Sequence, residues 1–186
     1  MELENQEPKD AGAECYRRYI QGDDSAFNDL VDMYAHGLIL FINRLVRNLA
    51  DAEDLMEDTF CELILHKKHF RAASGFKTYL YSIGRNKAVS YIRKNAKIIE
   101  NAVPEPVDSV DLADLIARRD RDRQLYNALS RLREEYRETL HLFYFEEMDY
   151  QQISAVLKKN KGQIKNLLYR GRQALKELLQ REGFEY

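Results

Sequence analysis

The residues near the carboxyl end of the chain have types and spacing that suit contact with nucleic acid. Four side chains recur at intervals of three and four residues and would share one face of a helix: Lys165, Tyr169, Arg172 and Lys176. Lys161, Gln163 and Asn166 stand near the start of the same stretch, and their ammonium and amide groups suit phosphates and base edges. The alternative is a solvated helix whose charges only keep the protein in solution.

A second basic segment mixes cations with aromatic rings. Residues 67–97 hold nine lysines and arginines and no acid. Five rings lie among them: Phe70, Phe76, Tyr79, Tyr81 and Tyr91. Such a mixture suits single-stranded nucleic acid, because phosphates take the charges and unstacked bases stack on the rings. The alternative is that the rings fill a helical core.

An acidic segment precedes the second basic one. Residues 50–62 hold six acids and no base: Asp51, Glu53, Asp54, Glu57, Asp58 and Glu62. On a helix these acids would spread around much of the circumference, so a solvated or protein-docking face is favoured over a metal site. Cys61, His66 and His69 suggest zinc, but their spacing of five and three does not place all three on one helical face.

The sequence carries no catalytic pattern that we recognise. It has no Gly-rich phosphate loop, no nucleophile elbow and no pair of catalytic acids. We therefore predict a protein without catalytic activity, cofactor or metal. An enzyme or metal sensor built around Cys61, His66 and His69 remains the alternative.

The overall composition hides this segmentation. The chain of 186 residues has 29 bases and 31 acids, and its net charge of -2 by itself argues against nucleic acid as a partner. By segment, the same charges form at least two cationic surfaces. No apolar stretch approaches the roughly 18 residues that a membrane span needs, the first ten residues lack a signal-peptide pattern, and two cysteines suit a reducing compartment. We expect a cytoplasmic protein without membrane insertion.

Helices must position all of these segments. Glycine and proline are scarce, and apolar residues recur with helical spacing, so we predict an all-α protein. A first helix is expected from a cap near Asp23 or Asp24, a second from Asp51, and a third over residues 76–95. Pro104 and Pro106 predict an acidic linker. Helices over residues 134–145, 150–157 and from residue 161 complete the pattern, and the last two form a helix-turn-helix.

Two pairs of sequence motifs resemble one protein family. DAEDLMEDTF (51–60) and FKTYLYSIGRNKAVSYIRK (76–94) resemble region two of the extracytoplasmic-function (ECF) sigma factors of bacterial RNA polymerase. LSRLREEYRETLHLFYFEEMDYQQISAVL (129–157) and KGQIKNLLYRGRQALKELL (161–179) resemble their region four. The resemblance covers about residues 23–95 and 129–179. It implies two small helical domains, at 10–97 and 118–186, joined by a flexible acidic linker at 98–117.

The resemblance also implies roles for the charged segments. The acidic helix would dock on the clamp helices of the largest subunit of core RNA polymerase, through Asp51, Glu53, Asp54, Leu55, Glu57 and Asp58. The minus-ten promoter element would be held in opened form by Arg71, Ala72, Ala73, Ser74, Gly75, Phe76, Lys77, Tyr81, Arg85, Asn86 and Lys87. The minus-thirty-five element would be contacted in the major groove by Lys161, Gln163, Lys165, Asn166, Tyr169, Arg170 and Arg172.

The expected function is therefore that of a sigma factor, which directs core polymerase to a promoter and helps to open it without bond chemistry of its own. The polymerase flap and an anti-sigma factor are further expected partners. The alternative is a helix-turn-helix regulator that binds duplex DNA without polymerase. One departure from the family pattern has a physical consequence: Lys158 stands where the turn between the last two helices usually has glycine, and a positive φ there would cost about 1 kcal/mol.

Overall fold

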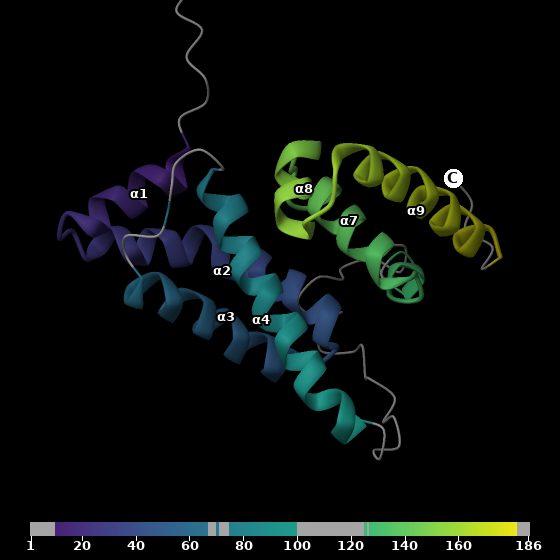
Figure 1. Cartoon of the computed structure of the whole chain (residues 1–186), viewed down its shortest axis with the longest axis horizontal. Coiled ribbons are helices and arrows are strands. Elements are labelled where there is room, and N and C mark those ends of the chain that lie inside the picture. Colours follow the sequence, from purple (N-terminus) through teal and green to yellow (C-terminus); the bar gives the residue numbers. More distant parts are fainter. Residues whose placement is uncertain (1–9, 67–69, 71–74, 100–124, 126, 182–186) are drawn as a thin grey trace, which may run out of the picture.

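The computed structural model describes residues 10–66, 70, 75–99, 125 and 127–181, and all the regular secondary structure in these residues is helical (Figure 1). The helices in the amino-terminal half are α1 (Ala11–Ile20), α2 (Ser25–Val46), α3 (Leu49–Leu65) and α4 (Phe76–Ile99). Those in the carboxyl-terminal half are α7 (Glu134–Tyr144), α8 (Tyr150–Leu157) and α9 (Lys161–Arg181). The predicted all-α fold is confirmed.

Helix α2 forms the centre of the amino-terminal unit and packs against α1, α3 and α4. Its apolar stripe includes Leu30, Leu38 and Phe41, which have no exposed surface. At the crossing with α4, a Cβ atom on Gly84 would lie 2.8 Å from a methyl carbon of Leu38, so the absence of a side chain lets the two helices approach closely. Helix α1 was not expected from the sequence. It contributes Tyr16, which is fully buried, to the same core.

In this unit the start of α2 after Asp24 and the start of α4 at Phe76 agree with the prediction, whereas the start of α3 differs. Helix α3 begins at Leu49, because Asn48 is its N-cap and accepts a 3.0 Å hydrogen bond from the backbone N–H of Asp51. Asp51 is therefore a first-turn acid and not the cap. Asp10 has two roles: one carboxylate oxygen accepts from Ala13 N–H at 3.0 Å and caps α1, and the other accepts from Phe76 N–H at 2.7 Å at the start of α4.

Capping boxes begin both helices of the predicted helix-turn-helix. At α8, Asp149 and Gln152 exchange side-chain and backbone hydrogen bonds. At α9, Asn160 accepts from Gln163 N–H at 2.9 Å, while the Gln163 side chain accepts from Asn160 N–H at 2.9 Å. Between them, Lys158 ends α8 with φ of 54°, the left-handed conformation that the turn requires. The predicted bounds of α8 and the predicted start of α9 are confirmed.

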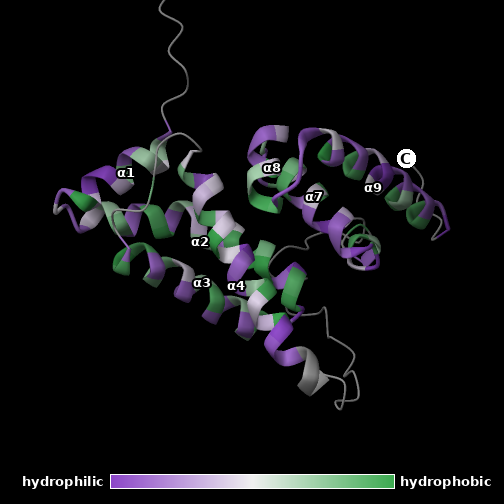
Figure 2. Ribbon diagram, viewed as in Figure 1, coloured by the Kyte–Doolittle hydropathy of each residue, from purple (hydrophilic) through white to green (hydrophobic). Residues whose placement is uncertain are grey.

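The two units pack against each other through α2 and α4 on one side and α7 and α8 on the other (Figure 1). Figure 2 shows that each of these helices carries both apolar and polar residues. Helix α4 continues to Ile99, past the predicted end at residue 95. The rest of the predicted linker at 98–117, with both of its prolines, lies outside the described residues.

Candidate functional site

The acids of α3 form one outward ridge. Glu53, Asp54, Glu57 and Asp58 are all exposed, whereas Leu55 is buried and supports the helix from below. Asp51 and Glu62 lie at the margin towards α4, where Asp51 accepts a hydrogen bond from Tyr91 and Glu62 pairs with Lys87 at 3.1 Å. The six acids thus occupy about half of the circumference of α3, and the four exposed ones form an anionic ridge.

The predicted minus-ten residues fall into separate environments. Arg71, Ala72, Ala73 and Ser74 lie outside the described residues. Gly75 is described and has φ of 72°, and Phe76 after it has no exposed surface. The Phe76 ring packs against Tyr16, Tyr34 and Phe70. Because a fully buried ring offers no face to a base, Phe76 is a core residue in this structure, and the prediction of a direct contact does not fit its position.

Two cations of α4, Lys77 and Arg85, are paired with carboxylates. Lys77 donates to the backbone oxygen of Glu146 at 2.8 Å and pairs with its carboxylate at 2.9 Å. Arg85 makes a two-pronged contact with Glu138, at 2.8 Å from Nε and 3.2 Å from Nη2. Asn86 alone of the predicted α4 contacts is exposed. The partners of Lys77 and Arg85 both come from the carboxyl-terminal unit.

Glu146 is the centre of a buried polar cluster between the units. Its carboxylate accepts from His141 Nε2 at 3.2 Å and also accepts from the Tyr81 hydroxyl. Although burial alone would raise it, the hydrogen bonds from His141, Tyr81 and Lys77 together lower the pKa of Glu146 to about 2. Burial lowers the pKa of His141 to about 4, and burial together with the Glu146 charge raises the pKa of Tyr81. At neutral pH the cluster therefore holds a neutral imidazole and an ionised carboxylate.

The Glu138 carboxylate is 3% exposed, and its Arg85 partner is 18% exposed. Burial raises the pKa of Glu138, and the hydrogen bonds from Arg85 only partly oppose this shift. The removal of both charges from water is thus costly, and the attraction between them does not fully compensate. The two-pronged contact joins α4 to α7 in a defined geometry.

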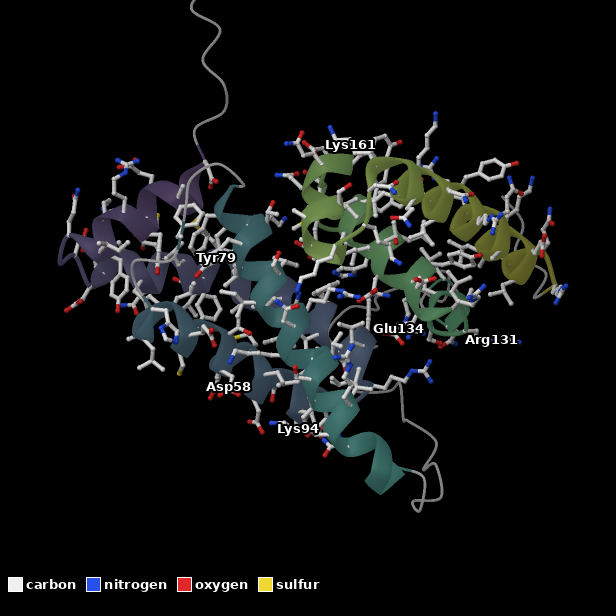
Figure 3. The ribbon with its side chains drawn as sticks, in the orientation of Figure 1. Asp58, Tyr79, Lys94, Arg131, Glu134 and Lys161 are labelled. Carbon is white, nitrogen blue, oxygen red and sulfur yellow. The ribbon has the colours of Figure 1, made fainter. Side chains whose placement is uncertain are left out.

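Helix α9 presents a separate cationic surface. Lys165, Asn166, Tyr169 and Arg170 are exposed, and the Tyr169 side chain is 64% exposed. Lys161 is also exposed and donates to Gln151 of α8 at 3.2 Å. Gln163 is exposed but uses its amide oxygen in the capping box described above, so only its NH₂ group is left for a base edge. In Figure 3, Lys161 and Asp58 lie on opposite sides of the molecule.

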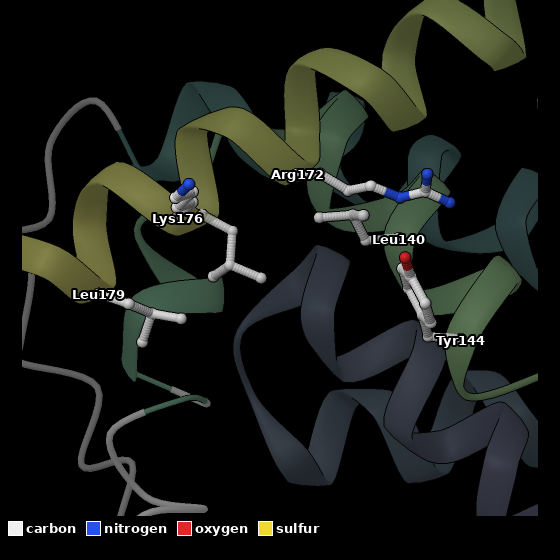
Figure 4. Close-up of a pocket in the computed structure, with 6 residues that line it drawn as sticks. Leu140, Tyr144, Arg172, Lys176 and Leu179 are labelled. Atoms are coloured by element: carbon white, nitrogen blue, oxygen red, sulfur yellow. The ribbon is translucent and has the colours of Figure 1, made fainter. Parts of the chain in front are cut away.

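Arg172 is exposed like Lys165, and it also contacts α7. Its guanidinium lies over the rings of Phe143 and Tyr144, at 5.4 Å from each centroid. It lines a groove of about 440 Å³ between α7 and α9, together with Leu140, Tyr144, Leu175, Lys176 and Leu179 (Figure 4). Arg172 is thus an exposed side chain that also packs at the edge of an apolar groove. Its contact with DNA stays a prediction.

Sequence reasoning missed the residues that join the two units. Glu138, His141 and Glu146 carried no motif, and His141 stood alone in the sequence. Glu138 and His141 are three residues apart and therefore lie on one face of α7, and this spacing was the only signal that the sequence offered. It could not identify partners more than 50 residues away, such as Arg85, which is 53 residues from Glu138.

The alternative of a zinc site gains no support from the described residues. In that part of the chain, no group of three or more His, Cys, Asp and Glu side chains is placed to hold a metal ion. His69, the third of the suggested ligands, lies outside it. Within the same described residues, no helix is long and apolar enough to cross a membrane.

The comparisons with known proteins match both halves of the chain. Residues 30–98 match the family model for Sigma-70 region 2, and residues 122–175 match that for Sigma-70, region 4. RNA polymerase sigma factor CarQ of Myxococcus xanthus is 30% identical over 166 residues, which cover 87% of this chain and 94% of CarQ. ECF RNA polymerase sigma factor SigM of Bacillus subtilis (strain 168) is 27% identical over 165 residues, which cover 83% of this chain and 95% of SigM.

Two solved structures have a similar arrangement of helices. The sigma factor RpoE, in a co-crystal structure with the anti-sigma factor NepR from Bartonella quintana, is 25% identical with a TM-score of 0.65, over 83% of this chain and 96% of that one. CnrH, in complex with the cytosolic domain of CnrY, has a TM-score of 0.70 over 92% of this chain and 98% of that one, at 21% identity, and supports the fold. A regulator with only a helix-turn-helix would not match region 2, so that alternative is not favoured. With both regions present in order on an all-helical fold, the chain belongs to the ECF group of sigma-70 factors and is an RNA polymerase sigma factor.

Proposed function

We propose that this sigma factor docks on core RNA polymerase through the acidic ridge of α3, formed by Glu53, Asp54, Glu57 and Asp58. The single observation that carries the proposal is their common exposure on one face, with Leu55 beneath them in the core. Such a ridge suits a basic helical surface, as the clamp helices of the largest subunit would provide. Asp51 lies at the edge of the ridge and supports it through Tyr91.

Each unit takes one part of the promoter in this proposal. The amino-terminal unit (10–97) would hold the opened minus-ten element, with Lys77, Arg85, Asn86 and Lys87 on α4 next to residues 71–75. The carboxyl-terminal unit (118–186) would place α9 in the major groove of the minus-thirty-five element. Lys165, Asn166, Tyr169 and Arg170 support this role because they are exposed at the amino-terminal half of α9. Lysine and arginine contacts to phosphates would make the affinity dependent on salt.

The factor would supply specificity and leave the chemistry to the polymerase. We therefore expect no catalytic activity of the chain by itself and action in the cytoplasm, where core polymerase and the genome are. An anti-sigma factor is a further proposed partner, since RpoE and CnrH were both solved in complex with a second protein. Contact with the polymerase flap stays a prediction.

Run-off transcription with purified core polymerase tests the proposal. Promoters selected from genomic fragments by the reconstituted holoenzyme would serve as templates. We expect a product of defined length that appears only when the factor is present, and a stable complex between factor and core. Duplex binding without either result would instead support a regulator that acts without polymerase.

A further inference from the structure

The α4 cations that the proposed function assigns to promoter DNA already have anionic partners within the chain. Lys77 pairs with Glu146, and Arg85 pairs with Glu138. Both carboxylates belong to the carboxyl-terminal unit, Glu138 to α7 and Glu146 to the turn that follows it. A carboxylate and a phosphate offer a guanidinium the same arrangement of two acceptor oxygens. Glu138 and Glu146 thus occupy the positions at which phosphates would bind Arg85 and Lys77.

The ring that a base could reach on α4 is covered by the same contact. Tyr81 is 1% exposed, packs against Phe41 and donates its hydroxyl proton to Glu146. On the other unit, His141 stacks on Phe41 at 5.6 Å and on Phe145 at 5.2 Å. The ion pairs and the ring stack together cover the face of α4 that carries Lys77, Tyr81 and Arg85.

The surface of α9 stays accessible while α4 is covered. Lys165, Asn166 and Tyr169 are exposed, and α9 contacts the molecule through α7 and α8. The same arrangement leaves the α3 ridge exposed on the far side of the amino-terminal unit (Figures 1 and 3). The structure therefore leaves the α3 ridge and the α9 surface exposed. On α4, Asn86 is also exposed, but Lys77, Tyr81 and Arg85 are engaged by the carboxyl-terminal unit.

We propose that the carboxyl-terminal unit is an intramolecular inhibitor of single-strand binding, in which Glu138 and Glu146 compete with DNA for Arg85 and Lys77. This inference rests on the proposed function of α4. The free factor is held closed, and the two units must separate before α4 can hold an unpaired strand. Duplex binding by α9 and docking by α3 do not require this separation.

The test removes the two carboxylate charges and keeps the shapes of the side chains. A variant with Glu138→Gln and Glu146→Gln is compared with a control that carries Glu134→Gln and Glu147→Gln. Both control residues are exposed, lie on the same helix and the same turn, and produce the same change in net charge. Affinity is measured by fluorescence anisotropy with a labelled random-sequence single strand of about 20 nucleotides, and separately with random-sequence duplex DNA.

We expect the double variant to bind the single strand at least about tenfold more tightly than the control does, since release of a contact worth about 1.4 kcal/mol changes affinity tenfold. Its duplex affinity should equal that of the control, because α9 is exposed in the closed form. Equal gains of single-strand affinity in both variants would reflect net charge only and overturn the proposal. Equal gains for single-strand and duplex DNA in the double variant would do the same.

A second measurement follows the separation of the units directly. Fluorophores are attached to cysteines introduced at the exposed positions Asp32 on α2 and Gln180 on α9, after replacement of the native Cys15 and Cys61. Energy transfer should decrease in the double variant and remain at the wild-type value in the control. A double variant with unchanged energy transfer and a native circular dichroism spectrum would overturn the closed-state inhibitor.

The two proposals fail in different ways. If the wild-type chain yields no run-off product, the proposed function fails whatever the energy transfer shows. If run-off transcription succeeds and the double variant neither separates nor gains single-strand affinity, the inhibitor fails and the sigma-factor function stands. Separation without a gain in single-strand affinity would also overturn the inhibitor, because Lys77 and Arg85 would then not be the groups that Glu138 and Glu146 withhold from DNA.

Discussion

Lys158 is the residue at which the turn between α8 and α9 departs most from ordinary backbone chemistry. Its φ of 54° lies in the left-handed region, where a Cβ atom crowds the adjacent carbonyl oxygen. Its backbone N–H still donates to the carbonyl of Ser154, so the helix end is satisfied despite the strain. On the α9 side, the capping box of Asn160 and Gln163 follows the turn directly.

Lys158→Gly should increase the free energy of unfolding by up to about 1 kcal/mol, because glycine adopts a positive φ without this crowding. Urea denaturation followed by circular dichroism measures the change. Lys158→Ala is the control, since it removes the same charge and keeps the Cβ atom. Equal effects of the two substitutions would show that charge, and not backbone strain, determines the stability of the turn.

At the scale of the element, α9 divides its cations between two tasks. Lys165 and Arg172 are both exposed, but the Arg172 guanidinium also lies over two rings of α7. Helical spacing alone placed them on one stripe. The position of α7 beside α9 distinguishes them, because one edge of that stripe borders the packed face.

Lys165→Ala should reduce the salt dependence of duplex binding by about one unit in the log–log slope, the value for one lost phosphate contact. Arg172→Ala should leave the slope unchanged and lower the free energy of unfolding by about 1 kcal/mol, through lost cation–π and packing contacts. Anisotropy titrations over a range of salt concentrations and urea denaturation provide the two readouts. A smaller salt slope for Arg172→Ala, with an unchanged slope for Lys165→Ala, would show that Arg172 and not Lys165 contacts a phosphate.

Helix α3 allows a charge test with a matched control. Asp54→Lys together with Glu57→Lys should weaken binding to core polymerase by about tenfold or more, because two attractive contacts become repulsive. Asp29→Lys with Asp32→Lys makes the same charge change at the same spacing on the exposed side of α2. Affinity is measured with fluorescently labelled factor and purified core. Equal losses in both variants would assign the effect to net charge and not to the α3 ridge.

For the whole molecule, the contact between the units is sensitive to acid. His141 has a pKa of about 4 in the folded protein and the usual value of 6.5 when unfolded, so the unfolded chain binds more protons between these values. Stability is therefore complete above about pH 6.5 and declines as the pH falls towards 4. Glu146 shifts stability in the same direction at lower pH, from 4.5 down to about 2. Arg44, Lys77 and Tyr81 surround the pair, and the two cations further oppose protonation of His141.

Between about pH 7 and about pH 5, the wild-type protein should lose on the order of 2 kcal/mol of stability through His141. Urea denaturation at the two pH values gives the loss, and interdomain energy transfer shows whether the contact between the units weakens. His141→Gln should reduce the loss, whereas His36→Gln, at an exposed position on α2, should leave it unchanged. If the His141→Gln variant lost as much stability as the wild-type protein, His141 would not be the group that causes the acid sensitivity.

Much of the helical organisation was predictable because it depends on local chemistry. Helical spacing located α2, α4, α7, α8 and α9, and the predicted starts of α8 at Tyr150 and of α9 at Lys161 agree with the structure. Helix α1 was missed because its apolar face is short. Its N-cap, Asp10, also accepts a hydrogen bond from Phe76 N–H, 66 residues away, and no local pattern indicates that contact. The start of α3 was placed two residues late, since Asp51 was taken as the cap and the cap is Asn48, three residues before it.

By itself, the sequence determined the family, the two helical units and the sign of the charge on each helix, because motifs, periodicity and charge are properties of neighbouring residues. Only the tertiary structure decided which charges are available. It left Glu53, Asp54 and Lys165 exposed, and it paired Lys77 and Arg85 with carboxylates from the other unit. Pairing over such a distance along the chain depends on how two helical units pack, and a local pattern contains no information about the partner that packing brings into contact.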